Sequence, residues 1–256
     1  MNRLQDRVAI ITGAGSGIGA ATALEFARQG AVVGVLDVIA DRVDAVVAAV
    51  KQAGGLAIGL VADVSRPDQV QTAVQQVVAQ TQRLDIVVNN AAVQVMGPLH
   101  TFTNEDFERL INVNLKGTFY VCKTVLPIFL EQNRGVALFT SSVLGLVADP
   151  DLAVYGATKA GMLGLMRSMA LAYGPRGIRT AAVCPGDVET PIVADYFRYQ
   201  PDPEASRREV YEHYPLRRIA EPIEVAKTLA FLASDDASFI SGTQVVVDGG
   251  LLSSVY

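Results

Sequence analysis

The sequence predicts an α/β fold in which helices cover both faces of one parallel β-sheet. Short apolar runs alternate with longer segments of helical periodicity along the chain, which is typical of βαβ units. The apolar runs are nearly continuous in Val, Ile and Ala, as expected for strands that are buried on both faces. A glycine-rich stretch directly follows the first run, where such folds turn from strand to helix.

Seven segments have the length and composition of buried strands. They are Arg7–Thr12, Ala31–Asp37, Leu56–Val61, Asp85–Asn89, Val136–Ser141, Ile178–Cys184 and Thr243–Val247. Helices are expected between them at Gly17–Gln29, Asp41–Gln52, Pro67–Gln82, Glu105–Leu130, Ala153–Ala172 and Glu221–Leu232. Pro67 suits the first turn of its helix, Asn104 is the expected N-cap of the next, and a break is expected near Gly117. Pro191–Tyr214 is expected to be irregular or short-helical.

At 256 residues, the chain is expected to form a single domain, residues 1–256, large enough to bury a substantial core. The formal net charge is −5 and no basic run is present, so a nucleic acid is not expected as a partner. The longest apolar runs, such as Val8–Ile11, are too short to span a membrane, and no membrane association is expected.

Cysteine and histidine are scarce in this chain. Cys122 and Cys184 lie far apart in the sequence, and so do His100 and His213. They do not form the clustered pattern of a metal site, so we expect no metal. Free thiols are expected, and the start of the chain lacks the pattern of a signal peptide, so a cytoplasmic protein is predicted.

The glycine-rich stretch is Thr12-Gly13-Ala14-Gly15-Ser16-Gly17-Ile18-Gly19, with the spacing T-G-x-x-x-G-x-G. Glycine permits a left-handed backbone and lets a ligand approach the main chain closely. The helix that follows offers free N–H groups and a partial positive charge to a pyrophosphate. The turn contains no lysine, which excludes a P-loop. A purely structural tight turn is the alternative.

Asp37 ends the second predicted strand, eighteen residues after Gly19. A carboxylate here can accept hydrogen bonds from the adenosine ribose of NAD and would repel the 2′-phosphate of NADP. A helix cap or a turn is the alternative role. Neither Ser16 nor Val38 offers a cation for a 2′-phosphate, although Arg42 lies near in the sequence. NAD is therefore the expected cofactor.

Tyr155 and Lys159 lie four residues apart in a predicted helix and therefore share one face. A free phenol titrates near ~10, and a shift to ~7 needs about 4 kcal/mol, which one ammonium at ~4 Å supplies at an effective dielectric of ~20. The pair thus predicts an acid/base group that works near neutral pH, with Ser142 as its candidate partner. A surface Tyr and Lys, with a turn Ser at a strand end, is the structural alternative.

These motifs occur in one order, and together they closely resemble the short-chain dehydrogenase/reductase family. The resembling features are the glycine turn, Asp37, Asn89-Asn90-Ala91-Ala92, Asn114, Ser142, Tyr155 with Lys159, Pro185–Pro191, Ser241-Gly242 and Asp248-Gly249-Gly250. The resemblance covers essentially the whole chain. It implies a Rossmann-type, doubly wound, seven-stranded parallel sheet, a nicotinamide cofactor, and interconversion of a secondary alcohol and a carbonyl compound.

The resemblance also assigns roles to individual residues. Asn114 would anchor a proton-relay water, Ser142 would bind the substrate oxygen, and Tyr155 would exchange the proton. Lys159 would lower the Tyr155 pKa and bind the nicotinamide ribose. The implied cofactor-binding residues are Gly13, Ser16, Gly17, Ile18, Gly19, Asp37, Asp63, Val64, Asn89, Ala91, Tyr155, Lys159, Pro185, Val188 and Thr190. Ala92 stands where a glycine is more usual in the family.

Residues 190–215 are expected to form a lid over the substrate. The candidate pocket residues by position are Gln94, Leu144, Asp151 and Asp187. The polar Gln94 and Asp187 favour a small hydroxylated substrate, such as a sugar or a polyol. The lid carries aromatic side chains suited to excluding water, which are Tyr196, Phe197, Tyr199, Tyr211 and Tyr214. Its arginines, Arg198, Arg207 and Arg208, either attract an anion or form a solvated helix face.

An NAD(H)-dependent oxidoreductase acting on CH–OH groups is thus the predicted function. A carbonyl reductase for 3-oxoacyl thioesters, a dinucleotide-binding regulator without catalysis, and a redox-neutral lyase on the same fold are the alternatives. The intact Ser142, Tyr155, Lys159 and Asn114 argue against the regulator, and the intact glycine turn argues against the lyase.

A homotetramer, or at least a dimer, is expected. Members of the resembled family commonly pair through the helix after Ser142 and through the last strand. Small residues on that helix would let a partner helix pack closely. They are Ala157, Gly161, Gly164, Ser168 and Ala172.

Overall fold

The structure is a computed structural model that describes residues 2–253, and it confirms one seven-stranded, parallel sheet. The strands are β1 (Val8–Thr12), β2 (Val32–Asp37), β3 (Leu56–Val61), β4 (Ile86–Asn89), β5 (Gly135–Thr140), β6 (Ile178–Pro185) and β7 (Thr243–Val247). Their order across the sheet is β3-β2-β1-β4-β5-β6-β7, so the chain winds outward in one direction from β1 and in the other from β4. Each predicted strand is present, with its ends within one residue of the expected ones.

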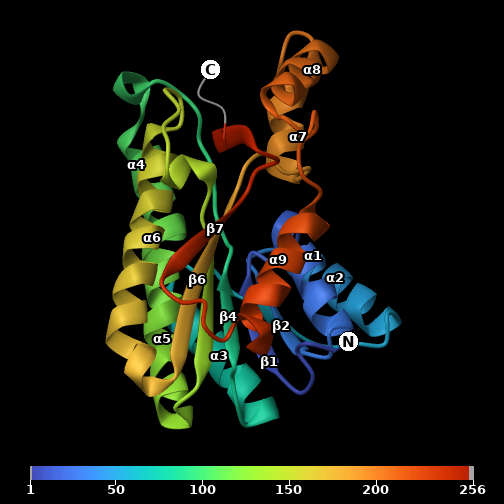
Figure 1. The fold of residues 1–256 in the computed structure, drawn as a ribbon, viewed down its shortest axis with the longest axis vertical. Helices are drawn as coiled ribbons and strands as arrows, with labels where there is room; N and C mark the ends of the chain where they lie inside the picture. Colours follow the sequence, from blue (N-terminus) through green and yellow to red (C-terminus); the bar gives the residue numbers. More distant parts are fainter. Residues whose placement is uncertain (1, 254–256) are drawn as a thin grey trace.

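Helices cover both faces of the sheet, as Figure 1 shows. The layer on one face consists of α1 (Gly17–Arg28), α2 (Ala40–Gln52) and α9 (Pro222–Ala233). The layer on the other face consists of α3 (Pro67–Thr81), α5 (Thr118–Gln132) and α6 (Ala153–Tyr173). This arrangement confirms the predicted doubly wound α/β class.

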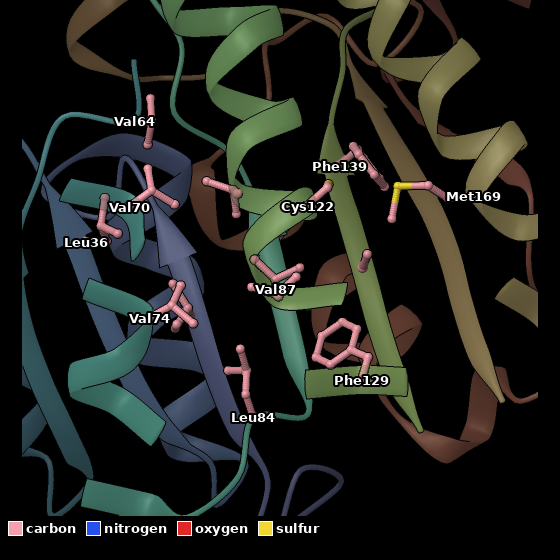
Figure 2. Close-up of a cluster of buried hydrophobic side chains, with 14 of the residues drawn as sticks. Leu36, Val64, Val70, Val74, Leu84, Val87, Cys122, Phe129, Phe139 and Met169 are labelled. Carbon is pink, nitrogen blue, oxygen red and sulfur yellow. The ribbon is translucent and has the colours of Figure 1, made fainter. Parts of the chain in front are cut away.

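Each helix layer encloses its own hydrophobic core. Successive residues of a strand point to opposite faces, so Ile10 packs under α3, α5 and α6, whereas Ile11 packs under α1, α2 and α9. Figure 2 shows the first of these cores, in which Val87 and Phe139 of the sheet lie in the same cluster as Phe129 of α5. Full burial of each such side chain contributes about 1.5–3 kcal/mol to the free energy of folding. The two cores together hold the sheet as one rigid platform.

The fourth predicted helix departs from expectation. It is divided into α4 (Asn104–Leu110), a widened π-helical stretch (Ile111–Gly117) and α5. The prediction of Asn104 as N-cap was wrong: Thr103 has the extended backbone of a cap, and its Oγ1 accepts a hydrogen bond from the backbone N–H of Asp106. The break expected near Gly117 is confirmed and takes the form of the π-helical stretch.

The segment expected to be irregular or short-helical forms two short helices, α7 (Pro191–Arg198) and α8 (Pro203–His213). They project from the end of the molecule where β6 leaves the sheet (Figure 1). Phe197, Tyr214 and Ile219 form a small cluster there that is separate from both sheet cores. The lid therefore carries its own packing.

The carboxyl ends of the parallel strands lie at one edge of the sheet, and the functional motifs follow those ends. Asp37 is the last residue of β2, and the segments after β1, β4, β5 and β6 carry Gly13, Ala91, Ser142 and Asp187 in turn. The winding reverses between β1 and β4, and ligands of open α/β sheets bind in the crevice at such a switch point. The topology therefore gathers the predicted site residues at one place.

Within residues 2–253, no helix has both the length and the apolar character needed to cross a bilayer. The thiols of Cys122 and Cys184 are free, as the sequence predicts, and both are buried.

Candidate active site

A cavity of about 890 Å³ opens at the carboxyl edge of the sheet and extends beneath α7 and α8. Most of the predicted site residues line it. Those in the wall are Gly13, Ser16, Gly17, Ile18, Asp37, Asp63, Val64, Ala91, Gln94, Ser142, Leu144, Tyr155, Lys159, Pro185, Asp187, Val188 and Thr190. Four predicted residues are outside the wall, namely Gly19, Asn89, Asn114 and Asp151. A smaller cavity of about 390 Å³ lies at the opposite edge of the sheet, and none of the predicted catalytic, cofactor-binding or substrate residues lines it.

The glycine turn brings backbone, not side chains, to the cavity. Gly13 and Gly17 adopt left-handed φ angles of 62° and 52°, which favour glycine. A Cβ on Gly19 would lie 2.1 Å from the carbonyl oxygen of Gly13, so Gly19 permits the turn to close on itself instead of touching a ligand. The side-chain amide of Asn90, which belongs to the Asn89-Asn90-Ala91-Ala92 motif, holds the turn by donating to the carbonyls of Thr12 and Gly13.

Asp37 is fixed in the cavity wall by two backbone groups. Its Oδ2 accepts from the N–H of Gly15 at 3.0 Å and its Oδ1 accepts from the N–H of Ile39 at 3.1 Å. Each oxygen keeps a further lone pair for a ligand. Arg42 also lines the cavity, and its Cβ lies beside Asp37 around the position of Gly15.

The Asn89 side chain does not face the cavity, so its predicted contact with a cofactor is wrong for the side chain. Its Nδ2 donates to the carbonyl of Leu138 at 3.2 Å and contacts the Sγ of Cys122 at 3.6 Å. The reason is strand alternation: Asn89 is the last residue of β4 and points into the core, whereas Asn90 follows the strand and turns to the cavity.

The first turns of α6 carry Tyr155 and Lys159 into the cavity wall, on one helix face as predicted. The Lys159 Nζ lies 5.4 Å from the centroid of the Tyr155 ring and donates to the carbonyl of Thr140, at the end of β5, at 2.7 Å. Only 2% of Lys159 is exposed. The ammonium is therefore fixed in place below the phenol, and side-chain flexibility does not set its position.

Ser142 follows β5 and lies beside Tyr155. Its Oγ accepts from the N–H of Leu144 at 3.1 Å, so it caps the short turn Val143–Gly145. Ser142 thus both caps a turn, as the structural alternative expects, and lines the cavity. The neighbouring Ser141, which sequence reasoning passed over, donates from its Oγ to the carbonyl of Lys159 at 3.0 Å and ties α6 to β5.

Asn114 lies in the π-helical stretch and is completely buried. Its Oδ1 accepts from the N–H of Val93 at 2.8 Å, while its Nδ2 donates to the carbonyl of Val93 and to the Oγ1 of Thr158. Thr158 in turn donates to the carbonyl of Tyr155 at 2.7 Å. The Asn114 side chain therefore positions the turn of α6 that carries Tyr155, and the proton-relay role remains a prediction.

Of the four candidate pocket residues, Gln94, Leu144 and Asp187 line the cavity and Asp151 does not, while Asp149 and His213 also line it. Of the lid aromatics, Tyr196, Phe197 and Tyr214 line the cavity, whereas Tyr199 is 81% exposed and Tyr211 is outside the wall. The idea that lid arginines attract an anion finds no support. Arg198, Arg207 and Arg208 are outside the wall and pair with Asp195, Glu189 and Glu204.

One of these ion pairs joins the lid to the loop after β6. Arg207 of α8 contacts the Oε1 of Glu189, and the hydroxyl of Tyr211 donates to the same oxygen at 3.0 Å. The Arg207 guanidinium also lies 4.5 Å from the ring centroid of Phe197 on α7. Because Glu189 stands between Val188 and Thr190 of the cavity wall, this cluster connects the position of the lid to that of the wall.

The cavity wall carries groups suited to binding a dinucleotide. The N-terminus of α1 and the left-handed glycines offer backbone N–H groups to a pyrophosphate, and the Asp37 carboxylate stands at one end. Tyr155 and Lys159 lie beside the end of β5, which is on the other side of the switch point from the end of β2 that carries Asp37. Among the described residues there is no cluster of three or more side chains suited to a metal ion.

Comparison with known proteins agrees with this geometry. A family model described as enoyl-(acyl carrier protein) reductase matches residues 13–252. Oxidoreductase UcpA of Escherichia coli (strain K12) is 40% identical over 253 residues, covering 98% of this chain and 96% of that protein. The 3-oxoacyl-(acyl-carrier-protein) reductase FabG of Thermotoga maritima is 38% identical over 250 residues, covering 98% of this chain and 99% of that protein.

A solved structure, that of levodione reductase, has a TM-score of 0.95 and 37% identity, and the match covers 99% of this chain and 100% of that one. The chain belongs to the short-chain dehydrogenase/reductase family. As a member of that family it is an oxidoreductase that acts on CH–OH or carbonyl groups and uses a nicotinamide dinucleotide. Its Rossmann-type fold follows from the same matches.

The pKa of Tyr155 differs from the value near neutrality that the sequence predicts. Burial raises the pKa of Tyr155 to about 12, and the Asp187 charge adds to the shift, while hydrogen bonding by Ser142 opposes it. Burial also lowers the pKa of Lys159 to about 8. The prediction that the ammonium alone brings Tyr155 near neutrality was wrong for this structure, because it omitted the desolvation of both groups.

Replacement of Lys159 by Met is expected to change how stability depends on pH. Between pH 8 and 10.5 the unfolded chain holds a proton on Lys159 that the folded chain has released, so wild-type stability rises with pH in this window. Lys159→Met has no ammonium at this position and therefore lacks this rise in stability with pH. Relative to that variant, the wild-type free energy of unfolding should increase by about 2 kcal/mol from pH 7 to pH 10.

Urea denaturation of both proteins at the two pH values measures this difference. Lys51→Met, which replaces an exposed lysine on α2, is the matched control and should show no such change. An equal pH dependence in wild type and Lys159→Met would contradict the burial of the charged ammonium.

Proposed function

We propose that this protein is an NAD(H)-dependent oxidoreductase that interconverts a secondary alcohol and a ketone on a small hydroxylated substrate, such as a sugar or a polyol. The observation that carries the proposal is the placement of Tyr155 in the cavity wall, beside Ser142 and above the fixed ammonium of Lys159. This arrangement offers a proton-exchanging group, a hydrogen-bonding hydroxyl and a positive charge at one end of a dinucleotide-sized cavity.

The roles of the chain's own groups follow from their chemistry. A bound nicotinamide supplies the hydride acceptor for oxidation and the hydride donor for reduction. Ser142 and Tyr155 hold the substrate oxygen by hydrogen bonds, and Tyr155 takes the hydroxyl proton in oxidation or gives it back in reduction. Lys159 stabilises the phenolate that oxidation requires and binds the nicotinamide ribose. The Asn114–Thr158 contacts keep Tyr155 in place while the proton moves.

The raised pKa of Tyr155 affects oxidation and reduction differently. At neutral pH the Tyr155 phenol is protonated, since burial raises its pKa to about 12. A protonated phenol is ready to donate to a ketone oxygen, whereas alcohol oxidation needs the phenolate. We therefore expect oxidation to speed up with rising pH more steeply than reduction does.

The alternatives are distinguished by specific features. A regulator without catalysis has no use for a desolvated Lys159 beneath Tyr155, because that arrangement costs stability. A lyase has no need for the dinucleotide cavity. The 3-oxoacyl thioester reductase remains a second candidate because FabG is among the relatives. The acidic substrate end, with Asp149 and Asp187, favours small hydroxylated compounds over a thioester.

Tyr155→Phe tests the proposed chemistry. The phenyl ring preserves the packing but carries no exchangeable proton, so turnover should fall by ~10²–10⁴-fold while NADH binding is retained. The measurement is NADH formation against a panel of sugars, polyols, hydroxy acids and cyclic alcohols, with NADH fluorescence for binding. Tyr173→Phe, at the far end of α6, is the control. A variant that keeps more than about a tenth of the wild-type rate would remove Tyr155 from proton transfer.

The cofactor is proposed to be NAD rather than NADP. Support comes from the Asp37 carboxylate, which its two backbone hydrogen bonds hold in the cavity wall. It can accept from ribose hydroxyls, and a 2′-phosphate there would place a second anion against it. A hydrogen bond to a charged group contributes about 1.5–3 kcal/mol, and like-charge repulsion acts in the same direction. Arg42 is the counter-argument, because it lines the same end of the cavity.

Catalytic efficiency should therefore be at least ~100-fold higher with NAD than with NADP, and Asp37→Ala should remove most of that preference. Steady-state kinetics with both cofactors measures it. Asp41→Ala, on the exposed side of the adjacent helix α2, should keep the wild-type ratio. Equal use of the two cofactors by wild type would reject the assignment, as would an unchanged ratio in Asp37→Ala.

A homotetramer, or a dimer, and a cytoplasmic location complete the proposal. Support for assembly comes from β7, an edge strand with Val246 partly exposed, and from the exposed Leu171 of α6 and Phe239 beside β7. Gly161 is not part of such a surface, because a Cβ there would meet Leu115 within the chain. Light scattering that shows only a 27.2 kDa species at micromolar concentration would contradict assembly.

A further inference from the structure

Asp187 occupies a rigid position at the substrate end of the cavity. It lines the cavity wall with Tyr155, and its charge is close enough to raise the pKa of that phenol. Its backbone is held on both sides of the chain: the Asp187 carbonyl accepts from the N–H of Ala220 at 3.0 Å, and the preceding Gly186 donates to the carbonyl of Val247 at 3.1 Å. The carboxylate is therefore fixed relative to the catalytic phenol.

The hydroxyl of Tyr214 orients the Asp187 side chain. It donates to the Oδ2 of Asp187 at 2.8 Å and accepts from the backbone N–H of Asp187 at 2.7 Å. Only 3% of Tyr214 is exposed, because its ring packs with Phe197 and Ile219. A Cβ on Gly186 would lie 2.8 Å from the Tyr214 oxygen, so the close approach depends on glycine at that position.

One oxygen of the carboxylate is left for a ligand. The structure gives Oδ2 a donor in Tyr214, whereas no described residue donates to Oδ1. Asp187 itself is exposed in the cavity wall, so Oδ1 is accessible to a bound molecule. A carboxylate oxygen accepts hydrogen bonds and donates none, so its natural partner on a substrate is a hydroxyl or an ammonium group.

The charges around Asp187 favour the same kind of partner. Desolvation raises the pKa of Asp187, and the negative charge of Asp149, which lines the cavity from the loop after β5, adds to that increase. His213 of α8 and Tyr214 act in the opposite direction. Arg109, also in the wall, forms no ion pair within residues 2–253. A hydrogen-bond donor between the two carboxylates relieves their repulsion, whereas an anionic substituent there increases it.

We propose that Asp187, oriented by Tyr214, is the specificity-determining residue of this enzyme and selects substrates that carry a hydroxyl or ammonium donor on a carbon close to the reacting one. This inference rests on the proposed alcohol–ketone chemistry and specifies its substrate class: vicinal diols, hydroxyketones and amino alcohols. Tyr214 is a positioning residue, since it acts through Asp187. A site built to hydrogen-bond a substrate group rejects analogues that lack the group.

A matched pair of alcohols tests the inference. The probes are 1,2-cyclohexanediol and cyclohexanol, which differ by one hydroxyl, and the readout is the ratio of their kcat/KM values in NADH formation. Wild type is expected to prefer the diol by at least about tenfold, as one hydrogen bond to a charged group implies. Asp187→Asn, which removes the charge but keeps the shape, should lower that ratio, and Asp187→Leu, which removes the acceptor, should bring it close to one.

Two further variants separate specificity from structure. Tyr214→Phe frees the carboxylate without removing it, and the ratio should fall between those of wild type and Asp187→Leu, whereas a merely structural defect would lower both efficiencies equally. Asp151→Asn is the control, because Asp151 lies in the same loop as Asp149 but outside the cavity wall. Its ratio should equal that of wild type.

The experiment can reject the role of Asp187 without rejecting the proposed dehydrogenase activity. Turnover of both alcohols with equal efficiency by wild type, or an unchanged ratio in Asp187→Leu, overturns the role of Asp187 and leaves the dehydrogenase proposal standing. A lack of NADH formation and of ketone reduction across the whole panel overturns both. A third probe, 2-aminocyclohexanol, identifies the donor: preference for it over the diol, lost in Asp187→Asn, supports the inference with ammonium as the selected group.

Discussion

The attachment of α6 to the ends of β4 and β5 is the constraint on which the rest of the site depends. The Lys159 ammonium donates to the carbonyl of Thr140 at the end of β5, and the Ser141 hydroxyl donates to the carbonyl of Lys159. Asn114 connects the loop after β4 to Thr158. These contacts fix the height and rotation of α6, and therefore the position of Tyr155 over the sheet. A buried ammonium is costly to hold in place, and the two hydrophobic cores on either face of the sheet offset that cost.

The sequence predicted the platform well because its signals are local and repeated. Val-rich and Ile-rich runs, the glycine turn and the spacing of Tyr155 and Lys159 each depend on neighbours along the chain. The misses depend on contacts between distant segments. The sequence Asn89-Asn90 does not reveal which side chain turns to the cavity, because a one-residue difference reverses the face. The Tyr155 pKa depends on burial, which a Coulomb estimate for an isolated pair omits.

The proposed substrate end of the cavity likewise combines features that local sequence predicts with contacts between distant segments that it does not. Gln94, Leu144 and Asp187 were placed correctly by their position after strands, and each lines the cavity. The Asp187–Tyr214 contact joins segments 27 residues apart, and no spacing rule predicts it. The lid arginines were uninformative for a related reason: their partners, such as Glu189 for Arg207, decide whether a charge faces a ligand or another side chain. Relatives that share the platform therefore do not determine which molecule the cavity accepts.

The separate packing of the lid has an evolutionary consequence. Phe197, Tyr214 and Ile219 form a cluster that shares no residue with the cores on either side of the sheet. Mutations that reshape α7 and α8 therefore leave the largest sources of folding free energy untouched. Selection can alter the lid in small steps while the dinucleotide half of the molecule stays constant. The sheet with its two helix layers stays constant while the lid varies. The chain can therefore acquire new substrates without first acquiring extra stability.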